Sequence, residues 1–556
     1  MDVRSLSSGF GEISATLSTL VRAGVLAPLR PDKYLRMAAS ARGGGSVTLG
    51  FAVTAQRCPD RPGLVDELGT LTWKQLDDRA SALAAGLQNL RVTSPESLRS
   101  GPPTPPRSVG IMCRNHRAFV TTLIAADRLG VDVLLLNTSF AGPALAEVVA
   151  REDVGVVVYD EEFADIVDRA LAERPDTTRV LGWTESPDRS DELTVEALSA
   201  THAGRHPVRA DRKGKVVLLT SGTTGTPKGA RSTSGGGAGE LKGILDRIPW
   251  RAEEVTVIAA PMFHAWGYSQ LIFAAFMANT IVTRRRFDPE ATLQLVDRHR
   301  ASGLVVVPVM LDRIMELPKE TRRRYSCRSL RFVTASGSRM RPDVVTAFMD
   351  EFGDVVYNNY NATEAGMIAT ATPADLRAAP DTAGRPAGGT EVRILDADHR
   401  EVPLGEVGQI FVRSGTLFDG YTTGATKHFH DGFMASGDMG HLDAEGRLFV
   451  VGRDDEMIVS GGENVYPIEV EKALTAHPDV AETSVLGVAD EQYGQRLVAF
   501  VVLRQGATTS PDELRGYVRD TLANYKVPRE ITVLDALPRN ATGKILRAEL
   551  RALAEG

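Results

Sequence analysis

The sequence predicts an α/β protein with a large N-terminal domain of parallel-type sheets and helices, a β-rich subdomain and a small α+β C-terminal domain. Strand and helix signals alternate from Leu49 onward, which is the pattern of parallel sheets covered by helices on both faces. Segments of alternating hydrophobicity, closed by turns, occupy residues 391–410 and indicate a β-rich subdomain. The order helix, strand, strand, helix from residue 468 onward indicates a compact final domain.

Length, composition and charge narrow the classes of function. The chain has 556 residues, so at about 150 residues per domain it would form three or four domains. Its hydrophobic content of 43% is typical of a globular protein with a sizeable core. The net charge is -7 and both signs are interspersed along the chain, which argues against nucleic acid as the main partner.

The cysteines and the apolar runs indicate a cytoplasmic protein. Cys58, Cys113 and Cys327 are far apart and form no CxxC pair, so we expect reduced, mostly buried thiols rather than a disulfide framework or a zinc site. No run approaches the roughly 18 apolar residues of a transmembrane segment, and the N-terminus lacks the pattern of a signal peptide.

Residues 1–45 are predicted to form an N-terminal extension. Ile13, Leu17, Leu20 and Val21 are spaced as on one face of a helix. We expect this helix to pack on the main body of the protein, and the alternative is peripheral contact with a membrane surface. The second interpretation is less favoured, because the segment lacks the Lys/Arg-rich polar face of membrane-surface helices.

Local signals define the first elements of the alternating region. Thr72 and Gln75 form a capping box, which predicts a helix that runs to about Leu90. The next expected elements are, in order, a strand at 109–113, a helix at 118–129, a strand at 131–136, a helix at 144–151 and a strand at 154–158.

A strand followed by a glycine-rich loop forms the centre of the predicted nucleotide site. The run Val216–Leu219 is typical of a buried strand, because it is short, apolar and ends in breaker residues. The loop after it offers unshielded backbone N–H groups, several hydroxyls and one lysine, which together can hold phosphate. It is not a Walker A loop, since Lys228 is preceded by proline and followed by glycine. The candidate phosphate-binding residues are Thr220, Ser221, Gly222, Thr223, Thr224, Gly225 and Lys228.

The stretch Thr220–Gly229 resembles the signature of the adenylate-forming superfamily, which contains acyl-CoA synthetases, luciferases and the adenylation domains of peptide synthetases. Further matches run from about Gly50 to Leu550. The resemblance implies an N-terminal domain at residues 46–452, with two parallel-type sheets, helices and a β-rich subdomain, and a small mobile α+β domain at residues 453–556. It also implies that the protein binds ATP and Mg²⁺, with Thr224 as one candidate ligand of the metal.

The segment Pro261–Gly267 is the candidate acyl pocket. A single histidine near aromatic residues is usually structural, but in the family a Pro-x-x-His segment at this place lines the acyl pocket. We therefore expect His264, Trp266 and Gly267 to contact the acyl group, and His264 to take part in catalysis. Adenylation domains of peptide synthetases have an aspartate near this point. Its absence here suits an uncharged acyl tail, because a buried carboxylate without a cationic partner is costly.

A second loop resembles the one that cradles adenine in the family. It spans Val333–Arg339, and its candidate contacts are Gly337 and Ser338. The usual Ala-Pro after the glycine is absent, with Arg339 and Met340 nearby instead, so backbone contacts are expected to matter more than side-chain contacts.

The pentapeptide Tyr360–Glu364 resembles the family pattern Tyr-Gly-x-Thr-Glu. The resemblance implies that Tyr360 stacks on adenine, Thr363 reaches the α-phosphate and Glu364 holds Mg²⁺. These roles suit a flat ring, a hydroxyl donor and a hard oxygen ligand. Asn361 replaces the glycine of the pattern. We expect the turn to persist, because asparagine tolerates positive φ better than other non-glycine residues.

Residues near the expected domain junction resemble the family's ribose, hinge and CoA motifs. Asp438 is the candidate acceptor for the ribose hydroxyls, and Arg453 would donate to the same sugar. Asp455, two residues after the arginine, is the expected hinge on which the C-terminal domain turns between two half-reactions. Gly461 and Gly462 would let the backbone pass close to the pantetheine arm of CoA.

The segment Pro538–Lys544 resembles the catalytic tail of the family. A lysine near the C-terminus is usually a solvated charge. The resemblance instead implies that Lys544 bridges the attacking carboxylate and the α-phosphate, where it neutralises charge that gathers in the transition state. Lysine suits this role because it is a compact cation on a long stem.

These matches together predict an acyl-CoA synthetase, which is an AMP-forming acid–thiol ligase. It would use ATP and Mg²⁺ to activate a small-molecule carboxylic acid, preferably a medium- to long-chain fatty acid, and would then transfer the acyl group to CoA. An aryl or short branched acid is the other option.

Two alternatives to this function are weighed against the sequence. A fatty-acyl-AMP ligase that loads a carrier protein is disfavoured, because Gly446–Arg453 runs into the hinge without an inserted segment. A non-catalytic nucleotide-binding homologue is disfavoured too, because the charged candidate site residues are all present.

Overall fold

The computed structural model divides into two compact units. Unit 1 consists of residues 1–380, 387–390 and 414–426, and unit 2 consists of residues 381–386, 391–413 and 427–556. The domain boundary predicted between residues 452 and 453 stays a prediction. The structure describes residues 14–26, 31–43, 48–90, 106–140, 142–186, 192–208, 212–220, 228–232, 238–415, 417–418, 420–422, 424, 426–456, 458–460, 463–490, 494–540 and 543–555.

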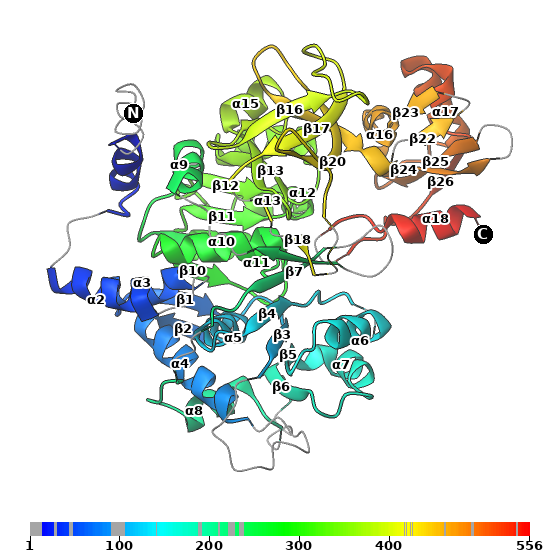
Figure 1. Cartoon of the computed structure of the whole chain (residues 1–556). Helices are drawn as coiled ribbons and strands as arrows, with labels where there is room; N and C mark the ends of the chain where they lie inside the picture. The colour runs from blue at the N-terminus through cyan, green and yellow to red at the C-terminus, as the bar shows by residue number, and fades with distance from the viewer. Residues whose placement is uncertain are drawn as a thin grey trace. The chain divides into compact units, whose positions relative to one another are not determined.

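One sheet of unit 1, sheet B, has seven strands in the order β18-β8-β7-β4-β3-β5-β6 (Figure 1). The strands from β7 to β6 are parallel, whereas β8 is antiparallel to β7 and β18 is antiparallel to β8. The strands are β3 (Ser108–Met112), β4 (Asp132–Leu135), β5 (Val156–Asp160), β6 (Thr178–Trp183), β7 (Val216–Thr220), β8 (Lys228–Ser232) and β18 (Gly420–Tyr421).

The other sheet of unit 1, sheet A, contains the order β14-β13-β12-β11-β9-β10-β1-β2. Its strands from β13 to β1 are parallel, and β14 and β2 are antiparallel to their neighbours. The strands are β1 (Pro62–Asp66), β2 (Gly69–Thr72), β9 (Val255–Ile258), β10 (Thr280–Thr283), β11 (Gly303–Val306), β12 (Phe332–Ala335), β13 (Val356–Ala362) and β14 (Gly366–Ala371).

Helices cover both sheets, as expected for parallel strands joined by crossovers. The helix α5 packs on β3 and β4, and α10 packs on β9, β10 and β11. The helices of unit 1 are α2 (Pro31–Gly43), α3 (Leu49–Arg57), α4 (Trp73–Asn89), α5 (Arg117–Arg128), α6 (Gly142–Arg151), α7 (Ala164–Ala170), α8 (Val195–Thr201), α9 (Ala238–Arg247), α10 (Ala265–Phe276), α11 (Pro289–His299), α12 (Pro308–Glu316), α13 (Lys319–Arg322), α14 (Pro342–Phe352) and α15 (Pro373–Ala378), with one 3-10 turn at Glu161–Phe163.

Local sequence signals placed most of these elements. The helix α4 begins at the predicted capping box, in which the backbone N–H of Gln75 donates to Thr72 Oγ1 and the backbone N–H of Thr72 donates to Gln75 Oε1. The five elements expected between residues 109 and 158 are all present, with ends displaced by one or two residues. The α/β fold class of the large domain is therefore confirmed.

The N-terminal extension packs on unit 1 with its polar face. Residues 14–22 are helical. Thr19 Oγ1 donates to Asp246, and the Arg57 guanidinium donates to the carbonyl oxygens of residues 24 and 25. Leu17 and Val21 are 49% and 58% exposed, so most of the expected apolar stripe faces solvent. Ile13 lies outside the described residues. None of the helices in the described ranges has both the length and the apolar character needed to cross a membrane.

Unit 2 contains an antiparallel sheet, sheet C, and a mixed sheet, sheet D. Sheet C has the order β16-β17-β20-β19 with β21 on β20, and sheet D has the order β23-β22-β25-β24 with β26 on β25. The strands of these two sheets are β16 (Glu391–Leu395), β17 (Gly408–Arg413), β19 (Phe429–His430), β20 (Phe433–Leu442), β21 (Leu448–Arg453), β22 (Ile458–Ser460), β23 (Glu463–Val465), β24 (Val480–Asp490), β25 (Gly494–Leu503) and β26 (Glu530–Val533). The short strand β15 (Arg385–Pro386) belongs to neither of them.

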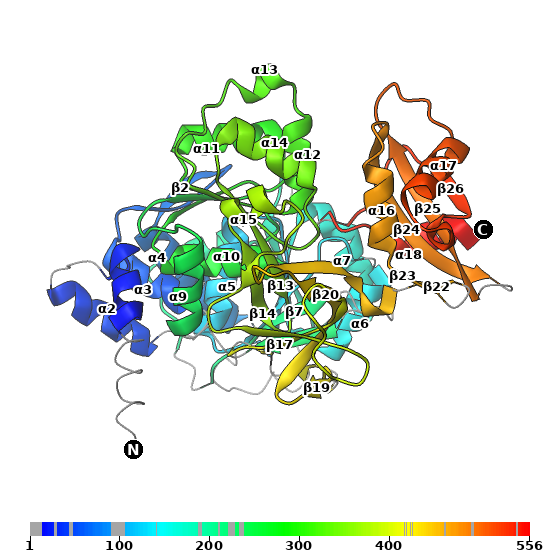
Figure 2. The ribbon, with the colours of Figure 1, turned by 90° about the horizontal axis from the view of Figure 1, so that it is seen from above.

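Helices pack against sheet D to complete the predicted α+β domain (Figure 2). α16 packs on β24, and α17 packs on β26. The helical elements of unit 2 are α16 (Pro467–Thr475), α17 (Pro511–Thr521) and α18 (Arg547–Glu555), with 3-10 turns at Asp454–Glu456 and Asn524–Lys526.

Replacement of Gly303 by alanine should destabilise unit 1. A Cβ atom at this position, the first residue of β11, would lie 2.2 Å from Cζ of Phe332, which is fully buried in the neighbouring strand. The ring or the strand must move, so we expect the free energy of unfolding to fall by about 1–3 kcal/mol. Urea denaturation of the full chain measures this loss.

Gly516→Ala is the matched control. Gly516 lies inside α17, and no atom lies within 4 Å of an added Cβ. Alanine should stabilise this helix by about 0.5–1 kcal/mol, because it restricts the unfolded chain. A loss of stability of similar size in both variants would contradict the packing described for Gly303.

Candidate active site

Three candidate segments meet at one edge of sheet A. The strands β9, β12 and β13 are parallel members of this sheet, so their carboxyl ends lie at the same edge. His264 follows β9, Gly337 and Ser338 follow β12, and Thr363 and Glu364 follow β13. Sequence positions separated by about a hundred residues are thus placed along one edge of unit 1.

The residues Tyr360–Glu364 form the end of the β13–β14 hairpin. Tyr360 pairs with Ala369, and the register shifts at Asn361, which pairs with Met367. The expectation that Asn361 occupies a positive-φ turn is wrong. Asn361 lies in extended β13, and the register shift supplies the bend, while Gly366 takes the left-handed conformation with φ of 70°. Thr363 and Glu364 occupy the connection between the two strands.

A buried asparagine fixes this hairpin to the neighbouring strand. Asn359 Nδ2 donates to Thr334 Oγ1 at 2.7 Å, and Thr370 Oγ1 donates to Asn359 Oδ1 at 3.0 Å. All three side chains are buried, so each bond is made away from water, where an unmade one would cost about 1–3 kcal/mol. Asn359 therefore joins β12, β13 and β14 directly before Tyr360.

Glu364 is tied to the hairpin that bears the phosphate loop. Tyr421 Oη donates to Glu364 Oε1 at 2.6 Å. Tyr421 belongs to β18, which pairs with β8 at Ala230, and the backbone N–H of Thr422 donates to Gly229 O at 2.7 Å. The candidate magnesium ligand thus sits beside the end of the β7–β8 hairpin.

Only the base of the phosphate loop is described. Thr220 and Lys228 are paired at the end of the β7–β8 hairpin, which confirms the strand expected before the loop. Ser221, Gly222, Thr223, Thr224 and Gly225 lie outside the described residues, so their roles stay predictions.

The segment after β12 is open to solvent. Gly337 has φ of 104°, and Ser338 is exposed. An added Cβ at Gly337 would have a single neighbour at 3.9 Å, a methyl group of Val307. The positive φ accounts for the glycine, because other residues rarely adopt that conformation. The adenine contact expected of these two residues stays a prediction.

The side chain of His264, at the same edge, has a polar atom without a hydrogen-bond partner among the described residues. His264 is the N-cap residue of α10 but makes no capping bond. The atom without a partner is Nε2, which is buried. Burial lowers the pKa of His264 to about 4, so its imidazole is neutral near pH 7. A neutral ring with an open nitrogen can donate to or accept from a ligand.

Trp266 and Gly267 have packing roles that account for their identity. The Trp266 indole is buried, and its Nε1 donates to Val306 O at 2.9 Å, which fastens α10 to β11. A Cβ on Gly267 would lie 2.2 Å from Pro261 O, so only glycine allows this close approach. The acyl contacts expected of both residues are untested.

Unit 2 brings together the two expected ribose-binding residues. Asp438 in β20 pairs with Arg453 in β21. The distance between Arg453 Nη1 and Asp438 Oδ1 is 3.7 Å. The backbone N–H of Asp438 donates to Ser436 Oγ, which holds the aspartate in place. Asp455, the expected hinge, lies in the 3-10 turn after β21. Gly461 and Gly462 lie outside the described residues.

A tight turn presents Lys544. The backbone N–H of Lys544 donates to Asn540 Oδ1, and the backbone N–H of Asn540 donates to Lys544 O, both at 2.9 Å. Gly543 has φ of 78°, which the turn requires of glycine. The Lys544 side chain is exposed. The backbone is therefore held at both ends of the turn, while the cation stays accessible.

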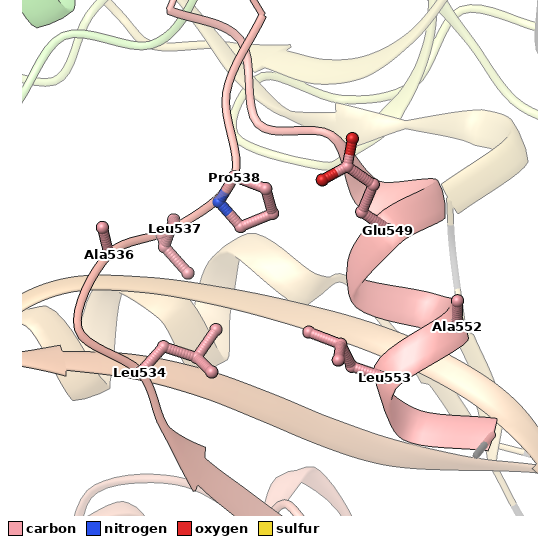
Figure 3. Close-up of a pocket in the computed structure, with 7 residues that line it drawn as sticks. All are labelled: Leu534, Ala536, Leu537, Pro538, Glu549, Ala552 and Leu553. Carbon is pink, nitrogen blue, oxygen red and sulfur yellow. The ribbon is translucent and has the colours of Figure 1, made fainter.

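An apolar hollow of about 550 Å³ lies beside this turn in unit 2 (Figure 3). It lies between the segment 534–538 and α18. Its lining offers no cation or backbone nest for phosphate, so it is not a candidate nucleotide site. The lining residues are Leu534, Ala536, Leu537, Pro538, Glu549, Ala552 and Leu553.

Comparison with known proteins identifies the family. A profile described as "AMP-binding enzyme" matches residues 51–422, and one described as "AMP-binding enzyme C-terminal domain" matches residues 469–544. The chain belongs to the AMP-binding enzyme family. The first match ends directly after β18, so it includes the strand that carries Tyr421.

Three similar proteins illustrate the range of the AMP-binding family. Indoleacetate–CoA ligase of Aromatoleum aromaticum is 32% identical, over 79% of this chain and 86% of the relative. Feruloyl-CoA synthase of Amycolatopsis sp is 30% identical, over 86% of this chain and 93% of the relative. A solved structure of o-succinylbenzoate CoA synthetase from Bacillus subtilis, in complex with its acyl-adenylate intermediate, is similar to this one with a TM-score of 0.73. The two sequences are 27% identical, and the match covers 90% of this chain and 97% of the relative.

A cluster of metal-ligand types elsewhere in this AMP-binding enzyme is a buried hydrogen-bonded network. Ligand atoms of Cys113, His116 and Asp160 lie within 4.8 Å of one another. His116 Nδ1 accepts the backbone N–H of Ala118, so its Nε2 carries the proton and donates to Asp160 Oδ1 at 2.8 Å. Metal binding at Nε2 would require the proton on Nδ1 and would break the bond from the backbone N–H of Ala118. Burial also raises the pKa of the Cys113 thiol.

All three cysteines have the state expected from the sequence. Cys58, Cys113 and Cys327 are free and buried. Burial raises the pKa of Cys58 to about 11 and that of Cys327 to about 12, so the thiols stay protonated.

The residues at the edge of sheet A suit a magnesium nucleotide. Glu364 offers a carboxylate and Thr363 a hydroxyl, and Mg²⁺ prefers such hard oxygen ligands. Besides His264 Nε2, the buried atoms Asn361 Oδ1 and Thr422 Oγ1 have no hydrogen-bond partner in the described part of unit 1. Buried polar atoms are normally paired. A polar ligand at this edge would supply such partners.

His264 should make the stability of the protein fall more steeply in acid. Its pKa is about 4 in the folded chain and about 6.5 in the unfolded chain, so as pH falls the unfolded chain binds the proton first. This contribution to stability is complete above about pH 6.5 and is lost as pH falls to about 4. It amounts to no more than about 3–4 kcal/mol.

Denaturation of the wild type and of His264→Gln at several pH values between 4 and 7 measures this effect. The variant lacks a titratable group, so the difference in stability between the two proteins should narrow or reverse as pH falls. A constant difference across this range would contradict the burial of a neutral imidazole at residue 264.

Proposed function

We propose that the protein is an ATP-dependent acid–CoA ligase. The observation that carries the proposal is the bond from Tyr421 to Glu364, which holds a carboxylate suited to Mg²⁺ beside the hairpin of the phosphate loop. The three similar proteins described above are named as CoA ligases or synthetases, which supports the same chemistry. ATP and CoA are the co-substrates of this reaction and Mg²⁺ is its cofactor.

The first half-reaction forms the acyl-adenylate. An oxygen of the substrate carboxylate attacks the α-phosphorus of ATP, and the bond to pyrophosphate breaks. Glu364 and Thr363 would bind the magnesium nucleotide, and Tyr360 would stack on the adenine. Lys544 would stabilise the charge that gathers in the transition state. Magnesium, where bound, supplies charge neutralisation on the phosphate oxygens.

The second half-reaction transfers the acyl group. The sulfur of CoA attacks the carbonyl carbon of acyl-AMP, the thioester bond forms, and AMP leaves with the bonding electrons. We propose that unit 2 residues after Asp455 change position between the two steps, with Gly461 and Gly462 beside the pantetheine arm. Asp438 and Arg453 hold the ribose throughout. No residue of the protein forms a covalent bond, so positioning and electrostatics carry the catalysis.

An aromatic carboxylic acid is the acyl substrate that we propose. The three similar proteins described above are named for indoleacetate, ferulate and o-succinylbenzoate, which all contain an aromatic ring. None of these three names refers to the fatty acid expected from the sequence. His264 suits an aryl acid because its neutral ring, 4.5 Å from the ring of Phe263, adds a polar atom to a partly aromatic surface.

Lys544→Ala should separate the two half-reactions. Loss of the cation should lower acid-dependent pyrophosphate release by about 10²–10³-fold, the usual effect of removing one group that stabilises transition-state charge. Thioester formation from supplied acyl-AMP should change little, because Lys544 belongs to the residues after Asp455 that are proposed to change position before that step. Pyrophosphate release and thioester formation are measured separately.

Arg551→Ala is the matched control for the loss of a cation. Arg551 is exposed on α18, near the Lys544 turn in sequence. Its replacement should leave both half-reactions unchanged. An equal loss of both half-reactions in Lys544→Ala would contradict the division of roles.

Pyrophosphate release across a panel of acids tests the function itself. The panel contains aryl and arylacetic acids and straight-chain acids from short to long, each with and without CoA. We expect CoA-stimulated turnover with the aromatic acids. Turnover that peaks with a long straight chain would restore the fatty-acid substrate. Release that CoA does not stimulate would favour a carrier protein as acceptor, and no release with any acid would favour a non-catalytic homologue.

A further inference from the structure

Three histidines gather on the surface of sheet C. His399 lies in the turn between β16 and β17, His428 directly precedes β19, and His430 is the second residue of β19. The Nε2 atoms of His399 and His428 are 3.1 Å apart. The ring of His430 stacks on that of His399 at 4.4 Å between centroids. Residues far apart in sequence thus place three imidazoles in contact.

The fold holds these rings by packing and by backbone bonds. Phe411 is fully buried, and the rings of His399 and His428 both lie edge-on to its ring. The distances between ring centroids are 5.8 Å for His399 and 6.1 Å for His428. The turn that bears His399 is closed by Asp396, whose Oδ1 accepts the backbone N–H groups of residues 398 and 400. His428 O accepts the backbone N–H of Ala435 at 2.9 Å.

The two Nε2 atoms share a hydrogen bond in this structure, and their spacing is close to that of two ligands on one metal ion. A bound ion would replace this hydrogen bond, and the ring that now donates would carry its proton on Nδ1 instead. For tetrahedral zinc with Zn–N bonds of about 2.0–2.1 Å, two ligand nitrogens are about 3.3 Å apart. The observed 3.1 Å is close to this value. Neutral imidazole is a preferred ligand of zinc, copper and nickel. His428 is exposed, so its ring has room to turn its lone pair toward a shared ion.

We propose that His399 and His428 chelate one divalent transition-metal ion, such as Zn²⁺, with His430 as an additional ligand. The ligand atoms of His430 do not converge with the other two in this structure, so a bound ion would draw this side chain in by rotation. Asp431, whose Oδ2 lies 3.6 Å from His430 Nε2, is an alternative oxygen donor, and water completes the shell.

The ion would join two segments that are otherwise weakly connected. β19 has two residues and lies at the edge of sheet C, so few backbone bonds hold it. A metal bridge would fasten it to the β16–β17 turn. Lys427, next to His428, donates to Ser436 O at 3.2 Å, two residues before Asp438. The bridge would therefore restrain the segment with Lys427 and His428, which contacts β20, the strand of Asp438. This site does not depend on the proposed ligase activity.

Zinc titration of the untagged full chain tests the site. The measurement is made by calorimetry without nucleotide and with millimolar Mg²⁺, which occupies oxygen-rich sites and competes poorly for imidazole. We expect one Zn²⁺ per chain. His399→Asn and His428→Gln should each weaken the affinity at least about tenfold. Asparagine is chosen at residue 399 because φ is 61° there, a conformation that asparagine tolerates. His430→Gln should have a smaller effect.

His206→Gln is the matched control, because His206 is an exposed histidine of unit 1 outside this cluster. It should bind zinc as the wild type does. A second readout is the rise in melting temperature with added Zn²⁺, which should disappear in His428→Gln. No zinc binding by the wild type, or an affinity unchanged by both His399→Asn and His428→Gln, would overturn the proposal.

Discussion

A buried carboxamide links the two sheets of unit 1 at their carboxyl edges. Asn115, in the loop after β3 of sheet B, accepts the backbone N–H of Met262 at 2.8 Å and donates to Ala260 O at 2.9 Å, in the loop after β9 of sheet A. The side chain is buried, so both bonds are made away from water, and an unpaired partner would be costly. The position of His264, two residues after Met262, depends on this link. The bond from Tyr421 to Glu364 makes a second connection between the same sheets.

Sequence reasoning predicted the parts of the fold that local signals determine. The capping box of α4 and the apolar runs of β3, β5 and β7 carry their own information, so these elements were found within one or two residues. β18 was missed, because two residues have no periodicity and their pairing partner lies in a distant part of the chain. The exposure of Leu17 and Val21 was missed as well. An apolar stripe indicates a buried face only when no polar contact, such as that from Thr19 to Asp246, orients the helix first.

The sequence allowed us to predict which residues belong to the candidate site, but not the contacts that position them. The motifs identified Glu364, Asp438, Arg453 and Lys544 because their chemistry is tied to short patterns. The residues that position them, Asn115, Asn359 and Tyr421, carry no such pattern, and each acts on a segment that only the fold brings near. Asn361 shows the same limit, since a bend that looked like a turn is produced by a shift in strand register. The acyl substrate depends on side chains around the pocket, where a few changes alter selectivity by small energies.

The position of β18 has a consequence for the synthesis of the chain. β8 is paired on one side by β7, but its other neighbour is Gly420–Tyr421, which follows it by roughly 190 residues. At translation rates of about 5–20 residues per second, the ribosome needs roughly ten to forty seconds to produce the partner. During this interval the nascent protein exposes an open strand edge, the kind of surface that other chains can pair with. Completion of the nucleotide domain is therefore a late event in translation, although its phosphate loop is synthesised before the middle of the chain.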